Sequence, residues 1–538
     1  MTERTPFQSP ELFRPSLQYP TYPYAEMLER TAERYPEQEA VLFHAINLTY
    51  RELNALVNSL ANALLDLGIE RGQRVCLFMG NCPEYIMSWF ALARIGAVAS
   101  PMNPSYKERE IAYQLNNSEA VALIVQRELL PLVEAVRDQT PDLKQLIVVG
   151  AEQDSPPDRL FSFANLVSFY PSTPLTGILP SGEDLLALPY SSGTTGLPKG
   201  VMLSHKNLVY NACQSIATAR ITCADRMLTF IPLYHIYGIM LMGCAAMSGA
   251  CLVLMERFEP GRWLQLIQEE RATIVYSVPQ VLAVVADWPD VEKYDLSSVR
   301  FNQCGAAPVP PALARRFEER TGITVMTSYG LTEASPGTHS NPVYNPRLIK
   351  VETIGLPIHD TEQKIVDIET GRIELGPGEE GELIVRGPQV MQGYWKAPEA
   401  SAEALRDGWL YTGDIGWRDE IGYVTITDRK KEMIKYKGFS VAPAQIEALL
   451  LEHPAVADVA VIAKPSEEAG EIPKAFVVLR PGHENQSADE LMAWVNGKLA
   501  TYKSVREIEY IDAIPRNPSG KILRRILKEQ EMQRMKQE

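Results

Sequence analysis

Residues 74–104 read RVCLFMGNCPEYIMSWFALARIGAVASPMNP, and this stretch indicates the fold of the chain. Its first apolar run, residues 74–80, predicts a buried strand, and Asn81 can cap a helix that has Pro83 in its first turn. A second strand is predicted at residues 97–104. Because a strand, a helix and a strand in this order join parallel neighbours, the sequence predicts an α/β protein built on parallel sheets.

Similar patterns continue along the chain and then change. From Val351 onward, short strands and turns predict a small β-rich subdomain. The charged run at 427–438 precedes a separate helix-and-strand pattern. We therefore predict a large N-terminal domain, residues 1–430, and a smaller α+β C-terminal domain, residues 431–538. Further buried strands are predicted by the apolar runs at residues 120–126, 145–150, 273–279 and 298–305.

The composition is that of an ordinary globular protein, with 46% apolar and 22% charged residues in a chain of 538. The net charge of −15 at pH 7 argues against broad nucleic-acid binding, which needs a basic face. Seven cysteines without a C-x-x-C pair favour a reducing, cytoplasmic location, and the first residues lack the apolar core of a signal peptide. Residues 238–255 carry no charge and just reach the length of a membrane span, but Ser248 and Gly249 divide them. A buried helix and strand are therefore predicted there, and no transmembrane segment.

The segment YSSGTTGLPKG, residues 190–200, combines glycines, hydroxyl side chains and a lysine. It departs from the P-loop pattern G-x-x-x-x-G-K-[ST], because Pro198 and Gly200 stand where glycine and Ser or Thr are required. Exposed amides, hydroxyl groups and the Lys199 cation are nevertheless what a polyphosphate needs. An isolated loop of this kind is more often a plain turn. The apolar runs on both sides place it on a scaffold, where such loops tend to carry function.

The longer stretch YSSGTTGLPKGVMLSH resembles the phosphate-loop signature of the adenylate-forming enzymes, a superfamily of acyl-CoA synthetases, peptide adenylation domains and beetle luciferases. Four further segments resemble motifs of this family in the family's order. They are residues 329–333 (YGLTE), 411–414 (YTGD), 428–431 (DRKK) and 515–521 (PRNPSGK). The resemblance spans residues 190–521 and implies an AMP-forming ligase that uses ATP, Mg²⁺ and coenzyme A.

A carboxylate that attacks the α-phosphate of ATP approaches a polyanion, so cations and donors must offset the repulsion. Glu333 is a suitable oxygen ligand for Mg²⁺, with Thr194 as a second ligand, and Thr332 can donate to the α-phosphate. The β- and γ-phosphates can be held by Lys199 and by the hydroxyls and amides of Ser191, Ser192, Gly193, Thr194 and Thr195. For the nucleoside, the resemblance implies a site formed by Gly305, Ala306, Ala307, Pro308, Ser328, Tyr329, Gly330, Asp414 and Arg429.

Within that nucleoside site, the resemblance implies that Tyr329 stacks on adenine and that Asp414 accepts from both ribose hydroxyls, with Arg429 at the same sugar. Each residue also has an ordinary alternative. Glu333 can be a surface charge and Asp414 a turn residue. Their register within the family motifs favours the functional interpretation.

Lys521 is the residue expected to assist the first half-reaction. A long cation can bridge the incoming carboxylate and the α-phosphate oxygens, although a lysine after Ser-Gly is more often merely solvated. The resemblance implies that the C-terminal domain is mobile and rotates about a hinge, here Lys431, so that a thiol can replace Lys521. After rotation, Lys435, Lys437, Gly438 and Phe439 would line the passage for coenzyme A.

The acid is expected to lie near the segment PLYHIYGI, residues 232–239. His235 can be an ordinary core histidine, but the resemblance makes it a gate or positioning residue near the carboxylate. No acidic or cationic partner for an ammonium group lies among the candidate pocket residues, which disfavours amino acids as substrates. The candidates are His235, Tyr237, Gly238, Gly305, Gly330, Ser335 and Pro336.

Two further segments bear on the substrate. Residues 387–401 (GPQVMQGYWKAPEAS) are most similar to medium- and long-chain fatty-acid–CoA ligases, whereas residues 435–447 (KYKGFSVAPAQIE) are closer to 4-coumarate–CoA ligases. The chain lacks the tryptophan that some long-chain enzymes carry after the histidine motif. We therefore place a fatty acid first and an aryl acid second. The sequence is also compatible with a carrier-protein acylating adenylase, a non-catalytic nucleotide-binding relative and luciferase-type oxygenation.

Overall fold

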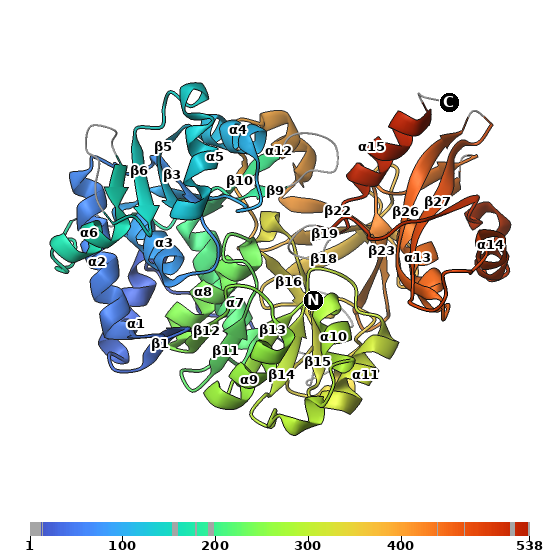
Figure 1. Cartoon of the computed structure of the whole chain (residues 1–538), viewed down its shortest axis with the longest axis horizontal. Helices are drawn as coiled ribbons and strands as arrows, with labels where there is room; N and C mark the ends of the chain where they lie inside the picture. The colour runs from blue at the N-terminus through green and yellow to red at the C-terminus, as the bar shows by residue number, and fades with distance from the viewer. Residues whose placement is uncertain are drawn as a thin grey trace, which may run out of the picture.

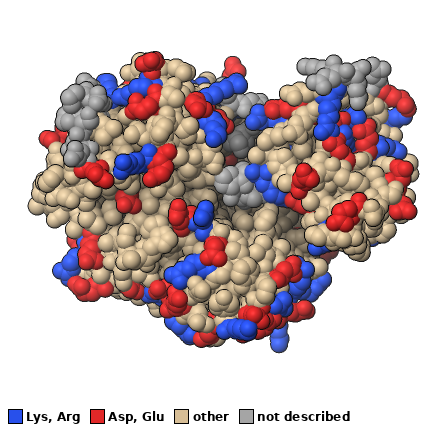
Figure 2. Space-filling model, in the orientation of Figure 1, with Lys and Arg blue, Asp and Glu red and all other residues tan. Residues whose placement is uncertain are grey.

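The computed structural model describes residues 12, 14–152, 160–177, 180–191, 198–437, 439–466, 468–516 and 522–535. Figure 1 shows a large lobe that holds most of the chain and a smaller lobe formed by the C-terminal end. The face in Figure 2 is hollowed between the two lobes, and acidic and basic side chains are mixed over both.

The opening stretch of the sequence forms the predicted strand–helix–strand unit. It consists of β3 (Arg74–Phe78), α3 (Pro83–Ile95) and β4 (Val98–Pro101), and β3 and β4 pair in parallel. Side chains alternate along β3, as they must in a strand. Val75 faces the large core, which also holds α3, whereas Cys76 faces a smaller core on the other side of the sheet.

Asn81 does not cap α3, because Cys82 occupies the N-cap position without a side-chain bond. The Asn81 amide instead donates to the carbonyl groups of Phe230, Ile231 and Met255 at 3.0–3.2 Å and accepts from the backbone amide of Leu233 at 2.8 Å. Pro83 at the first helical position has no amide hydrogen, so the helix needs its cap less. The expected cap is wrong, and the residue joins the ends of two different sheets.

This unit belongs to a nine-stranded sheet with the order β20-β10-β8-β4-β3-β5-β6-β7, to which β9 adds by pairing with β10. Neighbours from β8 through β7 are parallel, whereas β10 is antiparallel to β8, β9 and β20. The other strands are β5 (Ala120–Gln126), β6 (Gln145–Val149), β7 (Leu160–Ser162), β8 (Leu185–Ala187), β9 (Tyr190–Ser191), β10 (Lys199–Ser204) and β20 (Gly393–Tyr394).

A second nine-stranded sheet has the order β17-β16-β15-β14-β13-β11-β12-β1-β2 and is parallel from β1 through β15. The runs predicted at 273–279 and 298–305 form β13 and β14. Its strands are β1 (Glu39–Phe43), β2 (Ile46–Thr49), β11 (Arg226–Thr229), β12 (Cys251–Leu254), β13 (Ile274–Ser277), β14 (Phe301–Cys304), β15 (Val325–Gly330), β16 (Gly337–Ser340) and β17 (Leu356–Pro357).

Helices of the large lobe pack between and around these sheets, and one apolar core is shared by both sheets and by α1, α3, α7 and α8. The segment at 238–255 forms most of α8 and all of β12 and is almost entirely buried, as predicted. No helix within the described ranges is long and apolar enough to cross a bilayer. The remaining helices of this lobe are α1 (Met27–Arg34), α2 (Tyr50–Asp66), α4 (Glu108–Ser118), α5 (Leu130–Glu134), α6 (Phe163–Phe169), α7 (His205–Ala219), α8 (Ile236–Ser248), α9 (Pro260–Glu270), α10 (Pro279–Ala286), α11 (Pro311–Thr321) and α12 (Pro398–Ala404).

After Val351 the chain forms the small antiparallel sheet that its texture predicts. The order is β18-β19-β22-β21, and β23 pairs with β22 on the same edge as β21, opposite β19. Its strands are β18 (Glu362–Val366), β19 (Gly381–Arg386), β21 (Leu405–Arg406), β22 (Trp409–Arg418) and β23 (Val424–Arg429).

The smaller lobe is a five-stranded sheet with helices on both faces. Along β26, Val459 and Val461 face one apolar core, whereas Ala460 and Ile462 face a second core that Leu527 of α15 completes. The elements are β24 (Ile434–Tyr436), β25 (Phe439–Val441), α13 (Pro443–Leu451), β26 (Val456–Ser466), β27 (Gly470–Leu479), α14 (Ala488–Asn496), β28 (Glu507–Tyr510) and α15 (Arg524–Met535). The chain thus combines a large N-terminal domain of parallel-sheet subdomains with a smaller α+β domain, as predicted. The boundary at residue 431 stays a prediction.

Candidate functional site

Asp414 lies at the centre of the candidate nucleotide site. Its side chain is 4% exposed, and one oxygen accepts a short hydrogen bond from the hydroxyl of Tyr329. The other oxygen pairs with Nε of Arg429 at 2.9 Å, because β22 and β23 place the two residues opposite each other. These contacts bring together three residues that the motifs predict to share a site.

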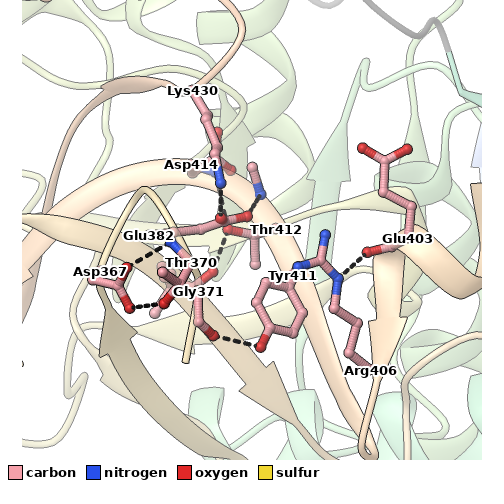
Figure 3. A network of polar contacts seen from close by, with 12 residues as sticks. Asp367, Thr370, Gly371, Glu382, Glu403, Arg406, Tyr411, Thr412, Asp414 and Lys430 are labelled. Atoms are coloured by element: carbon pink, nitrogen blue, oxygen red, sulfur yellow. Dashed lines mark hydrogen bonds and ion pairs between the residues drawn. The ribbon is translucent and has the colours of Figure 1, made fainter. Parts of the chain in front are cut away.

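The backbone around Asp414 is fixed by a second layer of polar contacts, shown in Figure 3. Thr412 donates its hydroxyl to the carbonyl of Leu383 at 2.7 Å. Gly413 has a φ of +71°, which suits glycine, and donates its amide to Glu382 at 3.1 Å. The same buried carboxylate pairs with Lys430 at 2.8 Å. The glycine of the motif is thus explained by backbone conformation.

Arg429 connects Asp414 to the candidate metal ligand. The pKa of its guanidinium is raised, first by the charge of Asp414 and also by Tyr329 and Glu333, against the effect of burial. An electrostatic effect of this kind requires the charges to lie close together. Glu333 therefore lies within the electrostatic environment of Arg429, although it is 81 residues before Asp414 in the chain.

Glu333 lies on the short 3-10 helix η6 (Thr332–Ala334), directly after β15. Its Oε1 accepts a hydrogen bond of 2.8 Å from the hydroxyl of Tyr394. Nζ of Lys199 lies 5.3 Å from the centroid of the same tyrosine ring. Tyr394 was not predicted as a site residue, although it lies in the segment at 387–401 that resembles fatty-acid–CoA ligases.

The residues for which the family resemblance implies contact with adenine lie where β14 and β15 end. Gly305 donates its amide to Ser277 at 3.2 Å, and Ala306 has a φ of +69°. A Cβ atom on Gly305 would lie 3.4 Å from Oγ of Ser328 and 3.5 Å from the ring of Tyr237. The candidate nucleotide and acyl residues therefore adjoin each other at this glycine.

Two residues that were not predicted from the sequence, Gln303 and His339, contact this region. Nε2 of Gln303 donates to Ser328 Oγ at 3.2 Å, and its backbone carbonyl accepts from the hydroxyl of Tyr237 at 3.3 Å. His339 packs edge-on against Tyr329 with ring centroids 5.9 Å apart. Burial lowers the pKa of His339 to about 4, so this imidazole is neutral at pH 7. The pairing of β15 with β16 places His339 opposite Tyr329, and the sequence did not predict this pairing.

The candidate acyl residues have structural roles of their own. Nδ1 of His235 accepts from the amide of Tyr237 at 3.2 Å and so begins α8. A Cβ on Gly238 would lie 2.3 Å from the carbonyl oxygen of Pro232, so the close approach of two backbones requires glycine there. Glycine is required at position 330 for the same reason, because a Cβ there would lie 2.4 Å from the carbonyl oxygen of Pro336. Ser335 donates its hydroxyl to the backbone carbonyl of Gln389 at 2.8 Å. Their contact with an acid stays a prediction.

The expected coenzyme A residues lie on the β24–β25 hairpin of the smaller lobe. Lys437 pairs with Glu468 at 2.7 Å, and the backbone amide of Lys435 donates to Glu471 at 2.7 Å. The ring of Phe439 is 55% exposed and packs against Tyr502. The predicted hinge residue, Lys431, is exposed between β23 and β24. Other predicted residues lie outside the described part of the chain, namely Ser192, Gly193, Thr194, Thr195, Gly438 and Lys521.

Asp428 connects the last strand of the large lobe to the smaller lobe. Its carboxylate accepts from the amide of Arg429 at 2.6 Å and from the amide of Ala444, in the first turn of α13, at 2.8 Å. Burial raises the pKa of Asp428 from 3.8 to about 6. Nearby, Arg524 binds both oxygens of Glu447 at 2.6 and 2.8 Å. These contacts lie on both sides of the predicted hinge.

The donor set fits a magnesium ion bound together with nucleotide. Mg²⁺ usually retains several waters and is bound by one or two carboxylates plus substrate phosphates. Glu333 would supply one such carboxylate to a metal that arrives with ATP. No cluster of three or more His, Cys, Asp or Glu side chains that could hold a metal occurs within the described ranges.

Comparison with known proteins agrees with this arrangement. A family model described as AMP-binding enzyme matches residues 28–395, and the C-terminal domain of the same enzymes matches residues 445–521. The chain therefore belongs to the AMP-binding enzyme family. Within it, the protein is an AMP-forming acid–thiol ligase, the class of enzyme that uses ATP, Mg²⁺ and coenzyme A.

Individual relatives of two kinds resemble the chain about equally. A long-chain-fatty-acid–CoA ligase from Bacillus subtilis is 33% identical over 96% of both chains. The 4-coumarate–CoA ligase 1 of Petroselinum crispum is 37% identical over 89% of this chain and 88% of its own.

Two solved structures also match nearly the whole chain. The anthranilate–CoA ligase AuaEII, solved with anthranoyl-AMP, has a TM-score of 0.87 and 30% identity over 96% of this chain and 98% of its own. ATP-bound MatB from Rhodopseudomonas palustris has a TM-score of 0.85 and 28% identity over 94% and 98%.

The raised pKa of Asp428 predicts a pH-dependent stability. A folded pKa of about 6, above the unfolded value, gives stability that is complete only below about pH 3 and is lost as the pH rises through 6. The difference in unfolding free energy between Asp428→Asn and wild type should therefore shift by about 3 kcal/mol in favour of the variant between about pH 3 and pH 7.5. Thermal unfolding across this range measures the shift. Asp407→Asn, at an exposed turn, is the control, and a difference that does not change with pH contradicts the prediction.

Proposed function

We propose that this enzyme activates a medium- or long-chain fatty acid to acyl-AMP, with release of pyrophosphate, and then transfers the acyl group to coenzyme A. The observation that carries the choice of acid is the apolar character of α8, which begins beside the candidate acyl residue His235. This helix contains no charged residue and is buried along most of its length. The hydroxyl of Tyr237 in its first turn is already bonded to Gln303, so this end of the helix would offer an acyl chain an apolar surface.

On the nucleotide side, Asp414 and Arg429 would hold the ribose and Tyr329 would stack on adenine. Lys199, with Ser191 beside it on the paired strand β9, would bind the outer phosphates. Glu333 and Thr194 would hold Mg²⁺, which supplies charge neutralisation on the phosphates when bound. Lys521 would bring a second cation to the α-phosphate and the incoming carboxylate.

We further propose that the C-terminal domain, residues 431–538, rotates about Lys431 between the two half-reactions. Lys435, Lys437 and Phe439 on the β24–β25 hairpin would then face the acyl-adenylate and receive coenzyme A. The exposed position of Lys431 between two sheets supports this role, since no packed core would have to be broken there.

An aryl acid is the second candidate substrate. Tyr237 and Tyr276 meet edge to face with centroids 6.1 Å apart, an arrangement that suits contact with another ring. The 4-coumarate–CoA ligases that resemble the chain support the same candidate.

A panel of C2 to C18 fatty acids and hydroxycinnamates tests the choice of acid. Pyrophosphate release is measured with ATP, Mg²⁺ and each acid, with and without coenzyme A. We expect the highest kcat/KM for saturated acids of eight or more carbons and acyl-CoA as the product. A maximum at a hydroxycinnamate would establish the aryl acid as substrate, and acyl-AMP that accumulates without acyl-CoA would point to a carrier protein as acceptor.

Lys521→Ala tests the division of labour between the domains. Acid-dependent pyrophosphate release should fall by about 100-fold or more, because a cation at the α-phosphate is lost from the transition state. Thioester formation from supplied acyl-AMP should be largely retained. Arg525→Ala, four residues further along the chain in α15 and paired only with Glu529 among the described residues, is the control. Equal loss of both half-reactions would refute the assignment.

Lys431→Pro tests the hinge. Proline fixes φ near −65°, so rotation at this residue should be restricted. We expect adenylation to persist while transfer to coenzyme A slows by about tenfold or more, measured in single-turnover assays of each step. An unaffected second step would remove Lys431 as the hinge.

A further inference from the structure

We propose that Tyr394 is a positioning residue. Its ring would hold Lys199 for the phosphates of ATP, and its hydroxyl would hold Glu333 for the metal. The inference rests on the proposed function, which gives these two residues their ligands. It adds a residue to the site that links the strand after the phosphate loop to the candidate metal ligand.

The contacts of Tyr394 with the two charged residues are of different kinds. Its hydroxyl donates to Oε1 of Glu333 at 2.8 Å. Nζ of Lys199 lies 5.3 Å from the ring centroid, within the range of a cation–π interaction. One side chain thus orients an anion through its hydroxyl group and a cation through its ring.

The backbone around Tyr394 is tied to both segments. Strand β20 pairs with β10, with Tyr394 opposite Val201, and the amide of Trp395 donates to the carbonyl of Gly200 at 2.8 Å. The amide of Met391 donates to the carbonyl of Glu333 at 2.8 Å. Residues 391–395 therefore connect the strand that follows the phosphate loop to the turn that carries the carboxylate.

This connection also explains why glycine stands at position 200. A Cβ atom there would lie 3.0 Å from the side chain of Leu188 and 3.3 Å from Cβ of Trp395. The close packing of β10 against the segment with Tyr394 leaves little room for the Ser or Thr of a P-loop.

A neutral spacer between the two charges has a physical advantage. In the described part of the chain, Lys199 and Glu333 each contact Tyr394 and do not form a direct ion pair with each other. A direct pair would have to be broken before either residue could bind its ligand. A tyrosine hydroxyl is ordinarily protonated at pH 7, so that of Tyr394 can donate to Glu333. This hydrogen bond orients the carboxylate of Glu333, which would hold the metal.

A purely space-filling role for Tyr394 is the competing interpretation, and Tyr394→Phe separates the two because it keeps the ring and removes the hydroxyl. The half-saturating Mg²⁺ concentration for acid-dependent pyrophosphate release should rise about tenfold, since a hydrogen bond to a charged group is lost. KM for the acid and the unfolding temperature should not change. Tyr394→Leu removes the ring as well, so it should also raise KM for ATP.

Tyr423→Phe is the matched control. Its hydroxyl donates to the carbonyl of Leu348 at 2.6 Å, and Nζ of Lys350 lies 4.4 Å from its ring, away from the candidate site. Removal of this hydroxyl therefore deletes the same kind of contact without touching Lys199 or Glu333, and the Mg²⁺ requirement should stay at the wild-type value.

Binding of Mn²⁺ gives a readout that does not depend on turnover. Electron paramagnetic resonance with a non-hydrolysable ATP analogue should show an Mn²⁺ dissociation constant about tenfold higher for Tyr394→Phe than for wild type. Wild-type values for Tyr394→Phe in both assays would overturn the proposal, as would equal changes in Tyr423→Phe. If wild type releases no pyrophosphate with any acid, the proposed function fails, whereas the Mn²⁺ measurement still decides the role of Tyr394.

Discussion

The candidate site depends on one buried carboxylate, that of Asp414. An isolated carboxylate at such a position would be costly, but the hydroxyl of Tyr329 and the guanidinium of Arg429 offset the loss of water. Tyr329 comes from the end of a parallel sheet, and Asp414 and Arg429 come from the antiparallel sheet. The contact therefore fixes the two sheets relative to each other and, through β23, sets where the smaller lobe begins.

Other polar groups of the site follow the same pattern, in which each group is held by a hydrogen-bond partner from another element. Glu333 is held by Tyr394 from β20, and Ser328 by Gln303 from β14. Such partners fix side chains before a ligand arrives, so less ordering has to occur on binding. The described nucleotide residues are in this sense preorganised.

The sequence was sufficient where the signal is local. Hydrophobic periodicity over consecutive residues was enough to predict several elements. These are the unit at 74–104, the strands at 120–126 and 145–150 and the α8–β12 segment. The grouping of Tyr329, Asp414 and Arg429 came from motif resemblance. Tyr394 could not be predicted in the same way, since its strand has two residues and its partner lies 61 positions away. The sequence predicted Asn81 as a helix cap because it gives no sign of the hydrogen-bond partners of Asn81, which lie about 150 residues further along the chain.

The junction of the two lobes shows how a packed contact can be compatible with movement. Asp428 receives two amide donors, yet burial still raises its pKa, so its charged form is held at some cost at neutral pH. A rotation at Lys431 would exchange the Ala444 donor for water and relieve that cost. The ion pair of Arg524 with Glu447 lies wholly within the smaller lobe and would travel with it intact. Among the described residues, the hydrogen bond from Ala444 to Asp428 across the junction is polar, and the apolar cores on either side would be undisturbed by rotation.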